Sequence, residues 1–234
     1  MKMKRRLLMI LGAVSMAVAL SMWPAQGAIA GTEASDACGG TGACAGNTGV
    51  IQSGACSGFE SCLLNGKLIK QNACNGSASC LQNQAIIKQG ACLGAQSCNY
   101  NNGIIDKFAC SISGSCESNS GKIGKEACNG ISSCSLNEGK IKRGSCEGIL
   151  ACNGNMGKIG KNSCQGFRAC DGNTGKIKSG SCNEANACVN NSGIIAKNSC
   201  NDAGACPDNE KGQRKWSKKK HKKHKHDRYS KYAD

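Results

Sequence analysis

Cysteine recurs in this chain with a fixed period of 18 residues, and this period constrains the fold more than any other feature. A second cysteine follows six residues after each of these, and no insertion or deletion breaks the register over ten copies. Folds with loops of varied length do not preserve such a count, whereas stacked coils do. The first set is Cys38, Cys56, Cys74, Cys92, Cys110, Cys128, Cys146, Cys164, Cys182 and Cys200; the second is Cys44, Cys62, Cys80, Cys98, Cys116, Cys134, Cys152, Cys170, Cys188 and Cys206.

Two other positions repeat with the cysteines. Counted from the first cysteine of each repeat, position 14 is Ile in nine copies, from Ile51 to Ile195, and fails only at Gln213. Position 10 is Asn in all ten: Asn47, Asn65, Asn83, Asn101, Asn119, Asn137, Asn155, Asn173, Asn191 and Asn209. An Asn at a corner tolerates a left-handed backbone, and its amide can donate and accept along a stack. We therefore expect a buried structural ladder of asparagines beside an apolar column of isoleucines.

These columns predict an all-β fold. Asn, Gly and small residues are poor helix formers, and a period of 18 residues is too short for a helical pair. Three short strands joined by tight corners use this length, with successive coils about 4.8 Å apart. The sequence thus predicts a parallel β-helix (β-solenoid) of ten 18-residue coils over residues 38–206, the last of them degenerate, after a lead-in at residues 31–37.

The cysteine spacing leaves three pairings to consider. One corner between two cysteines six residues apart can bring their sulfurs within bonding distance, so ten bridges inside the coils, Cys38–Cys44 through Cys200–Cys206, are the first choice. Bridges between equivalent cysteines of neighbouring coils are also compatible with the stacking distance. The third possibility, unpaired stacked thiols, would suit a protein that handles metals or redox equivalents.

The paired cysteines in coils rich in small residues resemble the beetle-type antifreeze β-helices, in which each coil carries one internal disulfide. The Asn column is similar to the asparagine ladder of right-handed parallel β-helix proteins. The 18-residue coil also matches the left-handed hexapeptide helices in length, but Ile at position 14 lies one residue out of hexad register with the cysteines at positions 1 and 7, so we favour a right-handed coil. The antifreeze resemblance implies ice binding through a flat array of threonines. Only Thr32, Thr41, Thr48 and Thr174 follow residue 30, and they form no column, so ice binding is a minor alternative.

Both ends of the chain differ from the repeats. Residues 1–30 combine early basic residues, an apolar stretch from Leu7 to Leu20 and the small-residue pattern Ala28-Ile29-Ala30, which is typical of a cleaved secretory signal peptide. We therefore expect a secreted or cell-surface protein with no transmembrane helix in the mature chain. Residues 207–234 hold eleven basic and four acidic side chains, which predicts a disordered basic tail.

Lysines gather on one outward side of the later coils. Since position 14 is expected to point inward, position 13 must point outward. Together with residues at position 16 and in the tail, they form a candidate polyanion-binding set: Lys122, Lys140, Lys158, Lys176, Lys125, Arg143, Lys161, Lys218, Lys219, Lys220, Lys222 and Lys223. The alternative interpretation is that these charges only prevent the rods from pairing side by side.

Catalysis is not expected. Residues 38–206 contain no histidine, so neither a serine nor a cysteine triad can form there, and their nine acidic residues fall at scattered repeat positions. We predict no cofactor, no metal site and no small-molecule substrate. The leading hypothesis is a secreted, non-enzymatic, disulfide-stiffened rod that binds anionic polymers or surfaces, such as polysaccharide, cell-wall polymer or lipid head groups. A self-assembling matrix or fibre subunit that associates end to end is the alternative.

Overall fold

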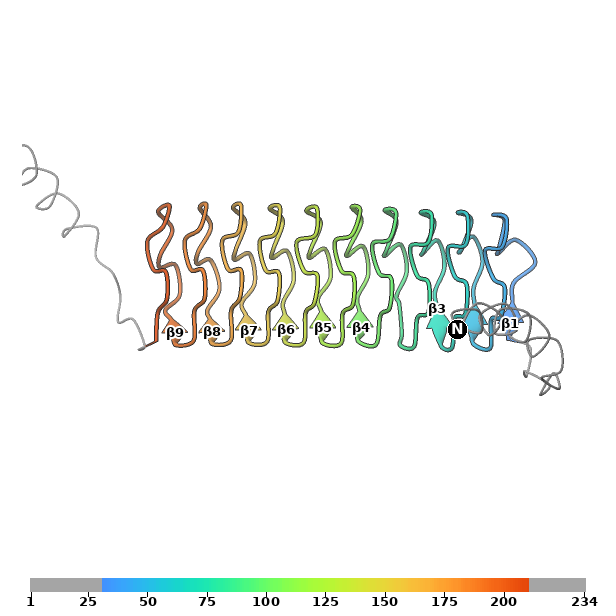
Figure 1. Cartoon of the computed structure of the whole chain (residues 1–234), viewed down its shortest axis with the longest axis horizontal. Helices are drawn as coiled ribbons and strands as arrows, with labels where there is room; N and C mark the ends of the chain where they lie inside the picture. Colours follow the sequence, from blue (N-terminus) through green and yellow to red (C-terminus); the bar gives the residue numbers. More distant parts are fainter. Residues whose placement is uncertain (1–30, 211–234) are drawn as a thin grey trace, which may run out of the picture.

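The computed structural model describes residues 31–210, which wind into a straight rod of stacked coils (Figure 1). The predicted signal peptide lies outside this range, as does the predicted basic tail from residue 211 onward. Residues 207–210, predicted as the start of that tail, instead continue the coil, since Asn209 is buried and donates to Asn191 at 2.7 Å. Residues 31–210 contain nine two-residue strands and no helix, and successive strands lie 18 residues apart except β3 and β4, which lie two repeats apart. The predicted all-β parallel solenoid is therefore confirmed. Within the described range no helix is available that could cross a lipid bilayer.

The strands form one side of the rod. They are β1 (Thr32–Glu33), β2 (Val50–Ile51), β3 (Leu68–Ile69), β4 (Ile104–Ile105), β5 (Lys122–Ile123), β6 (Lys140–Ile141), β7 (Lys158–Ile159), β8 (Lys176–Ile177) and β9 (Ile194–Ile195). All neighbours pair in parallel and join equivalent repeat positions, in a three-stranded sheet β1-β2-β3 and a six-stranded sheet from β4 to β9. Residues 31–37 thus supply the first strand as well as leading into the coils.

The gap between the two sheets has a local cause at position 12. Gly occupies this position in most coils because a Cβ there would meet the main chain of the next coil; one added to Gly157 would lie 2.1 Å from the carbonyl oxygen of Gly175. Lys67 and Ala85 are the exceptions. The two strand contacts that follow them are reduced to isolated bridges at Ile87. A side chain at position 12 therefore displaces the backbone enough to interrupt the sheet.

The core is thin and consists of columns. The isoleucines of position 14 from Ile51 to Ile195 are at most 2% exposed, so one apolar side chain per coil fills the interior beside the strands. The outward and inward positions alternate as the two-residue period of a strand requires, and the residue before each isoleucine points to solvent or is half-buried. A core of this thickness needs no aromatic residues.

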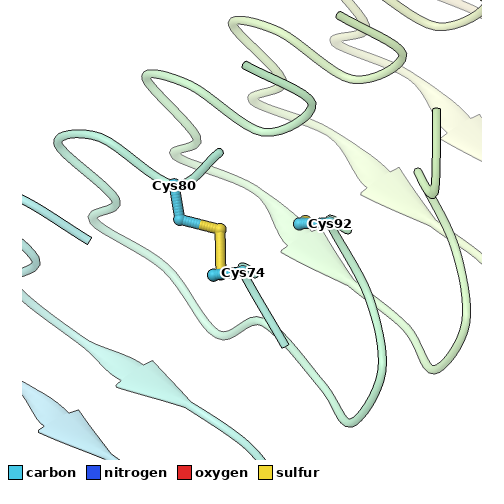
Figure 2. Close-up of side chains that lie close together, drawn as sticks. All are labelled: Cys74, Cys80 and Cys92. Carbon is cyan, nitrogen blue, oxygen red and sulfur yellow. A yellow bond between two sulfur atoms is a disulfide. The ribbon is translucent and has the colours of Figure 1, made fainter. Parts of the chain in front are cut away.

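The disulfides form a second column, and each bridge lies inside its own coil. All twenty cysteines are bridged at a separation of six residues, with Cα–Cα distances of 5.6–5.8 Å. Figure 2 shows Cys74 bonded to Cys80, with Cys92 of the following coil close by. The pairing inside the coils is thus the one present, and neither bridges between coils nor free thiols occur.

The asparagines of position 10 form one hydrogen-bonded ladder along the rod. Each side-chain Nδ2 donates to the Oδ1 of the Asn one coil earlier, at 2.7–2.9 Å. Many of these amides also donate to the carbonyl oxygen two residues ahead, as Asn137 does to Gly139 at 3.3 Å. The ladder satisfies buried amides that would otherwise each cost about 1–3 kcal/mol.

Tight corners make the short strands possible. Positions 1, 5, 9 and 17 have a positive φ in the described coils, and in one coil these are Cys56 (61°), Glu60 (48°), Leu64 (59°) and Asn72 (54°). Each such residue reverses the local winding of the chain, which a side chain other than Gly or Asn tolerates at a cost of about 1–2 kcal/mol. The cysteine of position 1 is always among them, so the disulfide closes directly against a corner.

The residues that precede the two cysteines of each coil differ between the N-terminal and C-terminal coils of the rod. From the coil of Cys56 to that of Cys128, Ala precedes the first cysteine and Ser the second; from the coil of Cys146 onward the order is reversed. The later serines bind the next coil, as Ser145 Oγ does by donating to the carbonyl of Gly160 at 2.6 Å. The earlier buried hydroxyls, such as that of Ser97, find no hydrogen-bond partner within residues 31–210.

Candidate polyanion-binding surface

Four lysines stand in one row on the outer face of the six-stranded sheet. Lys122, Lys140, Lys158 and Lys176 begin strands β5 to β8, point to solvent, and are direct partners in the parallel register. Figure 1 shows these four strands stacked in succession along the rod. We call this set the lysine row. Because the register has no slip, the amino groups originate one coil apart, about 4.8 Å for parallel strands.

Within residues 31–210 the lysine row forms no ion pair, although the charge of Lys122 contributes to lowering the pKa of Asp106. Among residues 31–210, the ion pairs within 4.0 Å are Lys88–Asp106, Lys125–Glu126, Arg143–Glu126 and Arg168–Asp171, and none includes a member of the row. Like charges directly opposite each other on a sheet are destabilising. Two unit charges at this separation repel by about 1 kcal/mol even in bulk water. An anion bound along the row would relieve this repulsion.

A shallow open trough of about 740 Å³ follows the row along the rod axis. The lysine row forms one wall, and position 11 supplies the other through Glu138, Met156, Thr174 and Ser192. Its floor is the glycine column of position 12: Gly121, Gly139, Gly157, Gly175 and Gly193. These glycines, which let the coils stack, lie between the two columns of side chains along the trough.

A second hollow, of about 590 Å³, lies on the other side of the row at its C-terminal end. Lys158 and Lys176 are shared between the two depressions. The hollow is lined by six lysines and by no acidic residue: Lys142, Lys158, Lys161, Lys176, Lys178 and Lys197. We call it the corner hollow. Among residues 31–210, none of these six lysines takes part in an ion pair.

The structure separates the predicted residues of position 16. Lys161 lines the corner hollow. Lys125 and Arg143 instead bind the carboxylate of Glu126, at 3.1 and 2.8 Å. Hydrogen bonds from these two side chains lower the pKa of Glu126, so it remains charged. Lys125 also lies 6.0 Å from the centre of the Phe108 ring. These two cations have local partners and are less available to a ligand than the lysine row.

Some predicted residues lie outside the described range and others were not predicted. Lys218, Lys219, Lys220, Lys222 and Lys223 belong to residues 211–234, which the structure does not describe. The corner hollow adds Lys142, Lys178 and Lys197 to the predicted set. Lys142 and Lys178 occupy position 15, where the sequence already shows them beside the lysines of position 13, whereas Lys197, at position 16, was not predicted. The glycine floor was visible in the sequence as a repeat but not as a surface feature.

The positive charge is confined to part of the sheet. Earlier coils have apolar residues at position 13, where Val50 is 43% and Ile104 is 39% exposed. Ile194, which occupies this position in the coil after the row, is 48% exposed. Position 13 therefore accepts any side chain that tolerates solvent. Its four consecutive lysines are not required by the fold, which makes them candidates for a role in binding.

The cysteine column offers no thiol chemistry. The sulfurs of Cys74, Cys80 and Cys92 lie within 4.8 Å of one another, as the close-up in Figure 2 illustrates, a spacing that three metal ligands could share. Each of these sulfurs is part of a disulfide, however, and is buried. A metal binds the thiolate, and a disulfide has none to offer. The chemistry of this column is thus covalent cross-linking.

The fold and this surface define a class of protein: a disulfide-bridged parallel β-solenoid with a cationic face. Two segments of the chain, residues 73–165 and 151–214, match the family described as Domain of unknown function (DUF7640). Because these segments together cover more than half of the chain, the protein belongs to that family. No curated protein and no solved structure shows a significant match.

Proposed function

We propose that this protein is a secreted, non-enzymatic rod that binds anionic polymers or surfaces through the lysine row, the corner hollow and the basic C-terminal segment. The observation that carries the proposal is the concentration of cations without local partners around Lys158 and Lys176, where the trough and the hollow meet. A surface with one sign of charge attracts polyions of the opposite sign.

Export is part of the proposal. Ten disulfides are typical of proteins that fold and persist in an oxidising compartment outside the cytosol. Residues 1–30 would direct the chain there as a signal peptide. Outside the cell, the available polyanions are acidic polysaccharides, cell-wall polymers and lipid head groups.

The fold supports a binding role for a rigid body. Each coil is cross-linked within itself and hydrogen-bonded to the next through the asparagine ladder, so the backbone positions from which the lysines of the row extend are held at fixed intervals. A ligand that matches these intervals meets a surface that loses little conformational freedom on binding.

Retention on an anionic resin tests this function. The probe is polygalacturonate coupled to beads, with uncharged dextran beads as the reference, and the readout is the salt concentration at which the full-length protein elutes. The variant Lys122→Gln/Lys140→Gln/Lys158→Gln/Lys176→Gln should elute at clearly lower salt. A second variant that lacks residues 211–231 measures the contribution of the basic segment.

A matched control removes the same number of charges elsewhere. Lys67, Lys70, Lys88 and Lys107 lie in earlier coils, outside both depressions. Their replacement by Gln should shift elution much less than replacement of the lysine row. Equal elution of the wild type, both quadruple variants and the truncated protein would contradict the proposed function.

A further inference from the structure

The trough constrains the shape of a ligand more strongly than its charge alone. It runs parallel to the rod axis past five glycines, from Gly121 to Gly193, a length of roughly 19 Å at about 4.8 Å per coil. One lysine per coil lines it over four successive coils. A linear chain laid along this floor meets a new positive charge at every coil, whereas a chain laid across it meets only one or two.

The walls indicate which kind of linear polyanion fits. A single-stranded nucleic acid binds largely by stacking its bases on aromatic side chains, and no aromatic residue lines the trough. Double-stranded DNA carries one charge per about 1.7 Å, far denser than one lysine per coil. The wall opposite the lysines instead offers the hydroxyls of Thr174 and Ser192 and the apolar side chain of Met156. These groups suit a polymer that carries hydroxyl groups and apolar ring faces.

We infer that the trough binds an extended chain of acidic sugars, a polyuronate, which lies along the lysine row parallel to the rod axis. This inference rests on the proposed function and names its ligand class. The length of a ring in such a chain is comparable with the spacing between coils, and the carboxylates of successive rings alternate between the two edges of the chain. The rings lie over the glycine column, and the carboxylates on the edge that faces the row form ion pairs with Lys122, Lys140, Lys158 and Lys176.

Glu138 is the one acidic side chain in this site. It lies in the wall opposite the lysines and belongs to the same part of the trough as Lys122 and Lys140. Its carboxylate would repel a polyuronate carboxylate nearby. The inference therefore requires that Glu138→Gln binds acidic sugar chains more tightly than the wild type does.

The number of lysines in the row predicts how the affinity depends on the length of the sugar chain. Solvent-exposed ion pairs contribute modestly, so each added acid sugar should raise the association constant roughly threefold until the row is filled. Four lysines predict a steep rise from one to four galacturonate units and a much shallower dependence beyond that. Removing the first lysine of the row, in Lys122→Gln, should move the break from four units to three.

The experiment is calorimetric titration of the full-length protein with galacturonate oligomers of one to eight units at low salt. The inference is supported by four results. The affinity of the wild type breaks at four units, the break shifts to three in Lys122→Gln, and it is unchanged in the control variant with Gln at 67, 70, 88 and 107. Glu138→Gln binds the oligomers more tightly than the wild type. An affinity that rises without a break, or that ignores Lys122→Gln, overturns the axial arrangement even if the polymer is still retained on the resin.

Two further ligands test the chemical class. Linear polyphosphate and a single-stranded oligonucleotide are titrated at charge counts matched to the tetramer. Weaker binding of both than of tetragalacturonate supports recognition of the sugar chain. Equal or tighter binding of either would overturn the assignment to polyuronates while leaving the proposed polyanion binding intact. Loss of retention for every polyanion, in contrast, would defeat the proposed function itself.

Discussion

The side-chain Nδ2 of Asn47 donates a hydrogen bond of 3.0 Å to the carboxylate of Glu33, which closes the N-terminal end of the asparagine ladder. Along the ladder every amide donates toward the N-terminus, so the first amide has a donor and no earlier Asn to accept it. Glu33 lies in β1, where position 14 of the other coils is isoleucine. A carboxylate therefore replaces the core side chain where the core ends.

Removing this acceptor should loosen the first coil. Glu33→Ala leaves the Nδ2 of Asn47 with only the carbonyl of Gly49 as acceptor, and we expect a loss of about 1 kcal/mol in the free energy of unfolding, since the carboxylate is exposed. Amide hydrogen exchange at residues 47–51 should accelerate while exchange in the central coils stays unchanged. Glu33→Gln keeps an acceptor oxygen, so its exchange rate at these residues should lie between those of the wild type and Glu33→Ala. Uniform acceleration along the rod would contradict a role confined to the end.

Interruption of the ladder at its centre should cost more. Asn137 donates to Asn119 at 2.7 Å and accepts from Asn155 at 2.8 Å, with all three side chains buried. Asn137→Ala leaves a buried donor and a buried acceptor unpaired, which predicts a loss of about 2–4 kcal/mol in denaturant unfolding without reductant. The exposed Asn102, whose replacement by Ala should have little effect, is the control. Similar losses for both variants would show that the ladder contributes no more than a surface amide.

The sequence predicts the coil, the ladder and the disulfides because each depends on a residue type repeated at one position. Cys74 and Cys80 can only reach each other across a corner, and Ile69 can only fill the interior if Leu68 faces out. Periodicity carries this information directly. For the same reason the outward direction of the lysine row followed from the burial of its isoleucine neighbours, which the structure confirms.

Features that depend on differences between coils could not be predicted in this way. The pairing of Lys125 and Arg143 with Glu126 requires side chains from adjacent coils to converge on one carboxylate. The corner hollow joins three repeat positions across a turn, and the trough depends on where Gly is retained at position 12. A repeat pattern fixes which side a residue faces, but the depth of a surface depends on the neighbours in the next coil.

The left-handed corners predict a stabilising substitution. Leu136 occupies position 9 with a φ of 58° and its side chain is 58% exposed, while the next two coils have Gly154 and Gly172 there. Leu136→Gly relieves the strained conformation and should raise stability by about 0.5–1 kcal/mol despite the greater freedom of Gly when unfolded.

The matched control is a leucine with an ordinary backbone. Leu93 is also exposed, at 41%, and is not among the residues with positive φ. Leu93→Gly should lower stability by about 1 kcal/mol. Denaturant midpoints of the two variants should therefore move in opposite directions, and a shared direction would refute the strain argument.

Glu147 predicts a dependence of stability on pH. Burial raises the pKa of this half-buried carboxyl to about 7. A hydrogen bond from Asn129 lowers the pKa, and the charge of Glu126 raises it by a smaller amount. Between the ordinary value of 4.5 and this raised value, the folded state binds more protons than the unfolded state. The stability contributed by this group is therefore fully present at low pH and is lost as the pH rises toward 7.

Replacement of Glu147 by Gln should remove this dependence, because the amide keeps the shape of the protonated acid and cannot ionise. At pH 8 the variant should be more stable than the wild type by about 1–2 kcal/mol, a value reduced from the full shift because the side chain is partly exposed. At pH 4, where the wild-type carboxyl is protonated when folded, the two proteins should unfold at nearly the same denaturant concentration. A stability difference that is equal at both pH values would mean that Glu147 acts through packing, since only its ionisation distinguishes the two conditions.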